Sequence, residues 1–399
     1  MKLLFLANRI PYPPYRGDKL KIYNLAKALH TKNQLVLIAF YENHHELKYK
    51  KDLLKYYDEV HLIKLKKGVV LWNLIRVIVN RNIPLQVAYF KSRKMTNTLN
   101  RVIKDFDPNA IHIQHLRMAQ FIDYKNIHRA LLDLPDAISM YFQRRRDCTN
   151  NPIKKRILNE EYIRLLKYEN SHLKRFKSVL CCSQEDLNHL LKRHPGPTYK
   201  VLENGVDTHT FQPHKSSIKT HEPRILFTGN MDYAPNVDAV CYFAHEIFPK
   251  IKEKHPTAIF EIAGQKPLKA VLELNKINDV EVTGFVPRLQ DAYARASVVV
   301  APIRFGAGTQ NKVLEALCME VPVVCTPIGF FGLSVKNGDG IYCEENTTHF
   351  INCLNHVLDD LAPHKLMATR TGAIIRNKYS WTEIAKKLEG YFKEIAEKN

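Results

Sequence analysis

Short apolar runs that alternate with amphipathic segments organise the first half of the chain. Five runs have the length and residue types of buried strands: LLFLA from Leu3, LVLIAF from Leu35, HLIKL from His61, AIHIQ from Ala110 and VLCCS ending at Ser183. Residues 19–30 instead carry apolar side chains at helical spacing, and another helix is predicted to start at Gln184. This alternation predicts a parallel sheet with helices on both of its faces.

A second series of the same kind follows a stretch with the composition of a linker, residues 201–223. The turn-forming residues of that stretch are Asn204, Gly205, Pro213, Ser216, Ser217 and Pro223. The strand-like runs beyond it are RILFTG, AIFEIAG, VEVTGF, SVVVAPI and VPVVCTP. Helices are predicted between them from about Val237, from about Leu289 and near Lys312, so a second doubly wound domain is expected.

We predict an α/β fold of two doubly wound, Rossmann-like domains that face each other across a cleft. The N-terminal domain is expected over residues 1–205 and the C-terminal domain over residues 206–379. A last helix within residues 380–399 is expected to pack back on the first domain, with one apolar stripe formed by Trp381, Ile384, Leu388 and Phe392. Ligands of such sheets bind at the carboxyl ends of the strands, but the fold alone does not define a function.

Composition excludes several classes of protein. No stretch approaches the roughly 20 apolar residues of a membrane span, and the run from Leu3 to Ala7 is too short for the core of a signal peptide. The eight cysteines are scattered without a C-x-x-C pair, which favours reduced thiols and disfavours a zinc site. We therefore expect a cytoplasmic protein, either soluble or attached to a membrane face.

Positive charge is concentrated in the first half of the chain. Residues 1–200 carry a net charge of +21 and residues 201–399 a net charge of −1. The stretch KLKKGVVLWNLIRVIVNRN from Lys64 also places Trp72 and long aliphatic side chains between basic ends, as in helices that lie at a membrane interface. Both features favour docking at the anionic inner face of a membrane. The alternatives are a solvated basic surface and a helix partly buried in the domain core.

The segment after SVVVAPI combines glycines and charged residues at a predicted helix start. Its notable residues are Arg304, Gly306, Gly308, Thr309, Lys312 and Glu315. Amide groups at a helix start bind phosphate, and glycines let the main chain approach it closely. Arg304 and Lys312 can neutralise a diphosphate, while Glu315 shares a helix face with Lys312 and can bind sugar hydroxyls. The alternative is a tight loop with a solvated Lys–Glu pair.

Two common nucleotide-binding motifs are missing from the sequence. There is no G-x-x-x-x-G-K-[ST] pattern, so the loop is not a Walker loop. There is also no G-x-G-x-x-G after the first predicted strand, which disfavours NAD binding.

Seven segments spread over nearly the whole chain match one known family. They are PYPPYRGDK from Pro11, HLRMA from His115, VLENGVDTHTFQP from Val201, FTGNMDYAPNVDAV from Phe227, FEIAG, VTGFVP and PIRFGAGTQNKVLEAL from Pro302. In these segments the chain resembles the retaining GT-B glycosyltransferases of the glycogen-synthase-like group, the family 4 type. It is most similar to the bacterial sugar transferases associated with exopolysaccharide gene systems.

The resemblance implies roles for residues of the second domain. Glu315 would bind the nucleotide ribose, and Arg304 and Lys312 would bind the diphosphate. The remaining donor contacts would come from Gly229, Phe285, Val286, Gly306, Gly308 and Thr309. Of these residues, Phe285 and Val286 would recognise the base, largely through their backbone. Two positions depart from the pattern, because many relatives carry a glutamate at Ala307 and an arginine at Asn230.

In the first domain the resemblance points to a glycine turn and a histidine. Gly17 matches a glycine at a helix start that faces the donor phosphates, and Asp18 is a candidate cap for that helix, although a plain strand-to-helix turn is the alternative. His115 matches a histidine that contacts the donor sugar in relatives. We prefer it to His112, which lies within the apolar run. A further loop at the edge of the cleft carries two carboxylates without an assigned role, Asp133 and Asp136.

These features predict a retaining glycosyltransferase that moves a hexose from a UDP- or GDP-sugar to a glycan or lipid-linked acceptor in surface polysaccharide or glycoconjugate synthesis. The resemblance implies that the leaving phosphate takes the acceptor proton, without an obvious enzymic nucleophile. No D-x-D motif stands in the expected place, so neither a metal nor another cofactor is expected. The alternatives are a nucleotide-sugar epimerase or hydrolase on the same fold, and a basic nucleic-acid-binding protein. The last has no helix-turn-helix, zinc or RNP-like pattern to support it.

Overall fold

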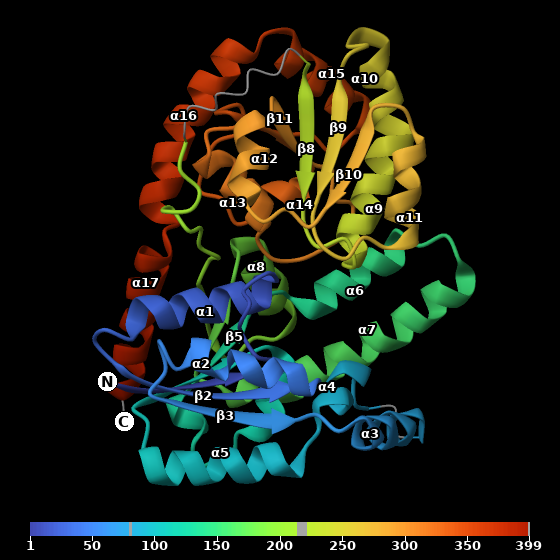
Figure 1. Cartoon of the computed structure of the whole chain (residues 1–399). Coiled ribbons are helices and arrows are strands. Elements are labelled where there is room, and N and C mark those ends of the chain that lie inside the picture. The colour runs from blue at the N-terminus through green and yellow to red at the C-terminus, as the bar shows by residue number, and fades with distance from the viewer. Residues whose placement is uncertain (80–81, 214–221, 398–399) are drawn as a thin grey trace. The chain divides into compact units, whose positions relative to one another are not determined.

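The computed structural model describes residues 1–79, 82–213 and 222–397 (Figure 1). The chain divides into two compact units, Met1–Glu203 with Trp381–Asn399 (the first unit) and Asn204–Ser380 (the second unit). The sequence patterns place the division after residue 205, and the contacts within the chain place it after Glu203. Residues 214–221 of the predicted linker lie outside the described residues, as do residues 80–81 and 398–399.

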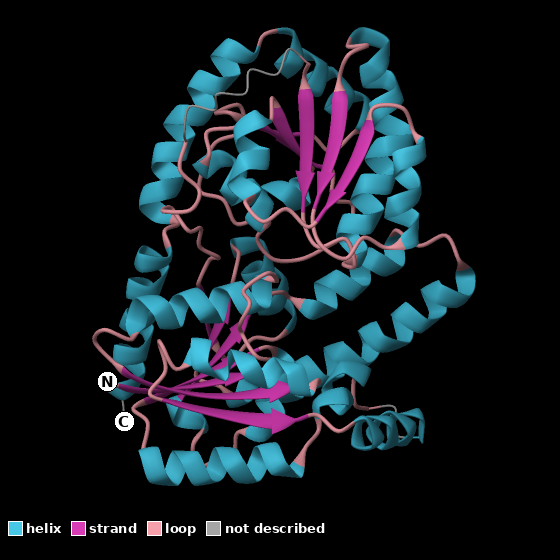
Figure 2. Ribbon diagram, in the orientation of Figure 1, coloured by secondary structure: helices cyan, strands magenta, loops and turns pink. Residues whose placement is uncertain are grey.

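The first unit is built on a seven-stranded parallel sheet with the order β3-β2-β1-β4-β5-β6-β7. The strands are β1 (Lys2–Ala7), β2 (Gln34–Tyr41), β3 (Glu59–Lys64), β4 (Ala110–Gln114), β5 (Ala130–Leu134), β6 (Ser178–Cys181) and β7 (Thr198–Val201). The central strands are almost continuously apolar because helices cover both faces of the sheet, as Figure 2 shows. The strand order reverses between β1 and β4, which makes the carboxyl ends of these strands the expected ligand-binding edge.

Helices and short helical turns fill the connections of the first unit. The helices are α1 (Gly17–Leu29), α2 (Lys50–Leu53), α3 (Lys67–Val79), α4 (Leu85–Phe90), α5 (Arg93–Phe106), α6 (Ile138–Asp147), α7 (Pro152–His172), α8 (Gln184–Arg193) and α17 (Trp381–Ala396). The turns are η1 (His44–Tyr49), η2 (Leu116–Phe121), η3 (Ile127–Arg129) and η4 (Leu173–Arg175). The predicted apolar stripe of α17 is buried in the core of this unit, where the Phe392 ring lies 6.3 Å from that of Phe5.

The second unit repeats this design with a six-stranded parallel sheet of order β10-β9-β8-β11-β12-β13. Its strands are β8 (Arg224–Thr228), β9 (Ile259–Ala263), β10 (Val280–Gly284), β11 (Val298–Ala301), β12 (Val323–Cys325) and β13 (Ile341–Cys343). Here the order reverses between β8 and β11. The structure therefore has the two doubly wound, parallel α/β sheets that the apolar patterns predict.

The connections of the second unit are also mostly helical. They are α9 (Ala234–Tyr242), η5 (Phe243–Ile247), α10 (Phe248–Lys254), α11 (Lys269–Leu272), η6 (Glu273–Lys276), α12 (Leu289–Arg295), α13 (Asn311–Cys318), α14 (Pro327–Phe330), α15 (Thr347–Asp359) and α16 (Leu361–Lys378). The helix predicted near Lys312 is α13, which follows β11 through the glycine-containing loop.

Candidate functional site

A tight turn follows β8 in the second unit and depends on two glycines. Gly229 has a φ of +156°, and a Cβ added to it would lie 2.5 Å from Asn236 Nδ2. Gly264, after β9, lies even closer to its neighbour, since a Cβ added to it would lie 1.6 Å from the carbonyl oxygen of Gly229. Side chains at these positions would push the turn apart. The two glycines thus let the main chain after β8 and after β9 pack closely at the carboxyl end of the sheet.

Lys312 lies in the first turn of α13 and is buried, with 7% of its surface exposed. Its Nζ donates to Asn236 Oδ1 at 2.9 Å and to Gln310 Oε1 at 3.3 Å, and lies 4.7 Å from the centre of the Phe227 ring. Asn236 Nδ2 in turn donates to the carbonyl of Asn230 at 3.0 Å. Burial lowers the pKa of Lys312 to about 8, although the charge of Glu315 opposes the shift. The structure thus joins this cation to the turn after β8.

Glu315 is partly buried one turn further along α13. The hydroxyl of Tyr293 on α12 donates to its Oε2 at 2.8 Å. Burial raises the pKa of Glu315 to about 7, while the Tyr293 hydrogen bond and the Lys312 charge act in the opposite direction. A carboxylate and an ammonium group with shifted pKa values at the carboxyl edge of an α/β sheet are typical of a functional site.

Arg304 is arranged differently from Lys312. Its Nε and Nη2 donate to the two carboxylate oxygens of Asp238 at 2.8 and 2.6 Å, and its guanidinium lies 4.5 Å from the centre of the Tyr242 ring. The side chain is 44% exposed. The sequence predicts that Arg304 and Lys312 act as a pair, but each is held by its own partner on α9, Asp238 for the former and Asn236 for the latter.

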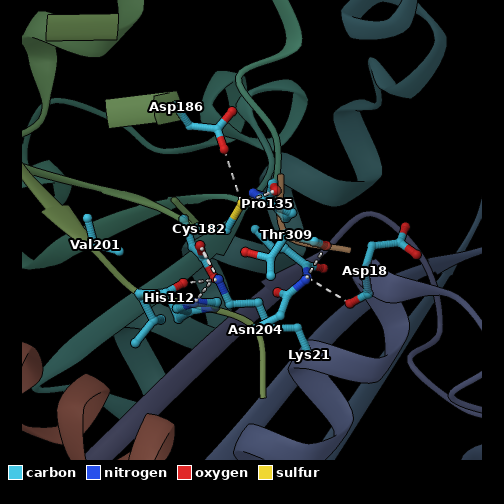
Figure 3. A network of polar contacts seen from close by, with 12 residues as sticks. Asp18, Lys21, His112, Pro135, Cys182, Asp186, Val201, Asn204 and Thr309 are labelled. Atoms are coloured by element: carbon cyan, nitrogen blue, oxygen red, sulfur yellow. Dashed lines mark hydrogen bonds and ion pairs between the residues drawn. The ribbon is translucent and has the colours of Figure 1, made fainter. Parts of the chain in front are cut away.

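The loop before α13 contains the other predicted donor contacts. Gly308 has a φ of +77°, a left-handed conformation that favours glycine, and Thr309 is buried. Asn204 Nδ2 donates to the carbonyl of Thr309 at 3.5 Å and to Asn311 Oδ1 at 3.0 Å (Figure 3). Asn204 therefore ties the start of the second unit to this loop, and α13 begins without a side-chain cap.

The segment predicted to contact the base follows β10. Gly284 ends that strand with a φ of +68°, and its carbonyl accepts a hydrogen bond from the amide of Gly264 at 2.8 Å. Phe285 is 53% exposed and Val286 is partly buried against the core of the unit. Through Gly264 this segment is connected to the turn that contains Gly229.

In the first unit, Lys21, Asp133 and His112 form a fully buried polar cluster (the buried triad). Lys21 Nζ on α1 donates to Asp133 Oδ1 and to the Leu202 carbonyl, both at 2.9 Å, and His112 Nε2 lies 3.0 Å from Asp133 Oδ2. Figure 3 shows Lys21 and His112 side by side in this network. Although burial opposes ionisation, the charge of Lys21 and the contact with His112 lower the pKa of Asp133 to about 2. The sequence places Asp133 in a loop at the edge of the cleft and assigns it no role, but the residue lies inside β5, where it holds α1, β4 and β5 together.

The start of α1 corrects one prediction. Asp18 does not cap this helix, because the N-cap is Arg16 and Gly17 is the first helical residue. Asp18 instead pairs with Arg9, whose Nε lies 3.2 Å from its Oδ2. Burial opposes ionisation here too, but the charge of Arg9 and the contact with His115 hold the pKa of Asp18 well below its usual range.

His115 lies just beyond β4 with a φ of +74°, and its Nε2 is 3.7 Å from Asp18 Oδ2. Burial and the charge of Arg117 lower the pKa of His115 to about 4, so the imidazole is neutral near pH 7. His112, by contrast, lies inside β4 with no exposed surface. The structure thus brings His115 to the start of α1 and assigns His112 to the buried triad.

Asp136, the other carboxylate without a predicted role, follows the carboxyl end of β5. Burial, together with the charges of Asp186 and Asp18, raises its pKa to about 7. Asp136 therefore adds a further group with a shifted pKa after the carboxyl end of β5.

Sequence reasoning missed four residues that organise these sites: Lys21, Asn236, Asp238 and Tyr293. Each makes its key contact with a residue far away in the sequence, so no local spacing marks it. Asn236 and Asp238 lie in the matched segment FTGNMDYAPNVDAV, which is the one signal that could have identified them. Among the described residues, no group of three or more His, Cys, Asp or Glu side chains could hold a metal ion.

The second unit also contains the match to a known family. Residues 222–360 match the family described as "Glycosyl transferases group 1". An uncharacterized glycosyltransferase of Methanocaldococcus jannaschii is 27% identical over 223 residues, which are 50% of this chain and 55% of that protein. The gpi3 subunit of phosphatidylinositol N-acetylglucosaminyltransferase from Schizosaccharomyces pombe is 24% identical over 207 residues, 50% of this chain and 44% of that protein. The chain thus spans about half the length of these relatives.

Solved structures resemble the chain over its whole length. Sucrose-phosphate synthase from Thermosynechococcus elongatus has a TM-score of 0.75 at 13% identity and covers 100% of both chains. The Anabaena protein HepE, in complex with UDP and glucose, has a TM-score of 0.69 at 15% identity and covers 99% of this chain and 100% of its own. These likenesses confirm the predicted GT-B fold. With the family match over residues 222–360, they support a glycosyltransferase.

Proposed function

We propose that this protein is a retaining glycosyltransferase that moves a hexose from a UDP- or GDP-sugar to a hydroxyl of a glycan or lipid-linked acceptor. The observation that carries the proposal is the pairing of Lys312 and Glu315 on α13, directly after a loop with a left-handed glycine. A buried cation at a helix start suits a diphosphate, and a carboxylate one turn later suits a ribose. The HepE complex with UDP-glucose supports a nucleotide sugar as the donor.

In this proposal, Lys312 neutralises the diphosphate, and Arg304 adds charge from its position on Asp238. The main chain at Gly229, Gly306, Gly308 and Thr309 lines the phosphates, and the backbone of Phe285 and Val286 contacts the base. In the first unit, His115 contacts the donor sugar and Gly17 the phosphates. The neutral state of His115 suits a hydrogen bond to a sugar hydroxyl, since it adds no charge beside the anomeric carbon.

The transfer step needs no covalent intermediate. The bond between the anomeric carbon and the phosphate oxygen breaks, and the acceptor oxygen bonds to the same face of that carbon. The acceptor proton goes to an oxygen of the departing diphosphate. The protein contributes positioning and electrostatic stabilisation of the leaving group, a role that the proposal gives to Lys312 and Arg304 rather than to a metal ion.

NMR spectroscopy of the products tests this function against its closest alternative. The protein is incubated with each nucleotide sugar, with and without an acceptor glycan extract. We expect a new glycoside whose anomeric configuration matches the donor, formed only with the acceptor. An epimerised nucleotide sugar, or free sugar released equally without acceptor, would instead indicate the epimerase or hydrolase.

We also propose that the protein docks at the anionic inner face of a membrane, where surface polysaccharide and glycoconjugate precursors carried on lipid are made. The supporting observation is α3, which exposes four apolar side chains, Val69 (44%), Leu71 (61%), Trp72 (61%) and Ile75 (47%). Basic residues flank them, Lys64, Lys66, Lys67 and Arg76. Such a pattern suits a helix at a lipid interface. No helix in the described part of the chain has the length and hydropathy of a membrane span.

A further inference from the structure

The hydroxyl of Tyr293, on α12, lies among polar groups from two other elements of the second unit, β8 and α13. It is 2.7 Å from Thr228 Oγ1 at the end of β8, 2.8 Å from Glu315 Oε2 on α13 and 3.3 Å from the Lys312 carbonyl. Tyr293 itself has no exposed surface. A phenol has one proton to donate. Of the two groups that can only accept it, the Glu315 carboxylate and the Lys312 carbonyl, the carboxylate is nearer and can carry a charge. Thr228 therefore donates to Tyr293, and Tyr293 donates to Glu315.

The chain of hydrogen bonds from Thr228 through Tyr293 to Glu315 (the relay) acts on a carboxylate whose neutral form is favoured by burial. Burial raises the pKa of Glu315 to about 7, and the groups that oppose it are Tyr293 and Lys312. The charged groups Asp207, Glu320 and Arg376 lie near the end of α13, where Arg376 of α16 donates to the Cys318 carbonyl at 2.7 Å and to Glu320 at 2.8 Å. Tyr293 is thus the one neutral hydrogen-bond donor to Glu315 among the described side chains.

We propose that Tyr293 is a positioning residue for Glu315: its hydroxyl, oriented by Thr228, fixes one carboxylate oxygen and leaves the other to accept the ribose hydroxyls of a nucleotide. The proposal rests on the proposed function, because it assigns Glu315 to the ribose. Thr228 directly precedes Gly229 in the chain. The relay therefore couples the turn that lines the phosphates to the carboxylate that binds the ribose.

Calorimetric titration with UDP and with GDP between pH 6 and 8.5 tests this role. Tyr293→Phe removes only the hydroxyl, so less of Glu315 is ionised at a given pH. We expect the acid side of the binding profile to move up by about one pH unit, which makes nucleotide binding about 5-fold weaker at pH 7 and brings it within about 2-fold of the wild type at pH 8. Thr228→Val should shift the profile in the same direction by less. In a Glu315→Gln background, Tyr293→Phe should cause no pH shift.

The matched control is Tyr379→Phe in the same unit. The Tyr379 hydroxyl is also buried and bonded, accepting from the Ser334 amide at 2.6 Å and donating to the Gly332 carbonyl at 3.2 Å. This variant should keep the wild-type pH profile. A Tyr293→Phe profile with the wild-type midpoint, whether or not affinity falls uniformly, would overturn the positioning role alone. Wild-type protein that binds neither nucleotide, or Glu315→Gln that binds as tightly as wild type, would overturn the assignment of Glu315 to the ribose as well.

Discussion

The ionisable groups of the two units are organised in contrasting ways. In the second unit, Lys312 and Glu315 lie three positions apart on one helix, next to the glycine loop that precedes it. In the first unit, Lys21 and Asp133 are 112 residues apart in the sequence and meet only through the tertiary structure. We propose that the first arrangement binds a ligand, because it places a cation and a carboxylate next to a glycine loop at a helix start. The second satisfies its charges internally, so it stabilises a fold rather than binding a substrate.

The contrast extends to charge and surface. The excess of positive charge lies within residues 1–200, where α3 also exposes Trp72 and its apolar neighbours. The match to glycosyl transferases group 1 lies in the nearly neutral remainder of the chain. This difference supports our proposal that α13 of the second unit binds the nucleotide and that the basic first unit docks at an anionic surface. Four predictions test this contrast.

The largest effect is expected at the buried triad. Asp133→Ala leaves the Lys21 ammonium buried without its counter-ion, which should lower the free energy of unfolding by about 3–5 kcal/mol. Because the pKa of Asp133 in the folded protein, about 2, is below the ordinary 3.8, its stabilising contribution is present above pH 4 and is lost as the pH falls toward 2. Urea unfolding at several pH values measures both effects.

The matched control for the triad is the more exposed ion pair of Glu203 and Lys387, joined at 2.7 Å. Glu203→Ala should cost less than about 1 kcal/mol. If Asp133→Ala is no more destabilising than Glu203→Ala, the triad does not stabilise the first unit as we describe.

The next effect concerns the phosphate contact in the second unit. Lys312→Ala should lose about 1.5–3 kcal/mol of charge-assisted bonding, which corresponds to roughly 10- to 100-fold in kcat/KM. Lys365→Ala, at an exposed lysine of α16, is the control and should leave transfer unchanged. Wild-type kinetics in Lys312→Ala would remove this residue from the diphosphate site.

A smaller effect is expected in the pH dependence of nucleotide binding. Glu315 must be ionised to accept ribose hydroxyls, and its pKa of about 7 makes affinity fall below that pH. Lys312 must be protonated to neutralise phosphate, and its pKa of about 8 makes affinity fall above that pH. Calorimetry should therefore give a maximum between the two values. Glu315→Gln should weaken binding of both the free nucleoside diphosphate and the nucleotide sugar, and remove the acid side. Loss with the nucleotide sugar alone would assign Glu315 to the donor sugar.

The smallest effect is expected at the membrane. The protein should sediment with anionic but not with neutral liposomes, since each basic residue near such a surface contributes roughly 1 kcal/mol. Binding should fall with ionic strength, because salt screens charges beyond a Debye length of about 8 Å. Trp72→Ala should weaken the binding that remains at high salt, whereas Leu366→Ala, at an exposed leucine of the second unit, should not. Equal sedimentation with both kinds of liposome, or with neither, would leave the basic half as a solvated surface.

The contrast between the two units also shows which structural features could be predicted from the sequence. Apolar runs of four to eight residues mark buried strands directly, so most strands of both sheets and the stripe of α17 follow from local patterns. The strands β5, β7 and β13 are not predicted. The placement of Lys312 and Glu315 one turn apart on the same helix follows from helical spacing in the same way. Residues such as Tyr293 and Asp133 could not be predicted, because their roles depend on partners that only the tertiary structure brings together. For the same reason, the sequence could not predict that Asp18 forms an ion pair with Arg9 instead of capping α1.

Thermal unfolding with a panel of UDP- and GDP-sugars tests the central claim most directly, because it needs no knowledge of the acceptor. A nucleotide sugar that binds the folded protein should stabilise it by roughly 2.7 kcal/mol at 100 times its Kd. We expect such a shift with at least one nucleotide sugar, and a clearly smaller shift in Lys312→Ala at the same concentration. No shift with any member of the panel, or equal shifts in the wild-type and Lys312→Ala proteins, would contradict a nucleotide-sugar site at α13.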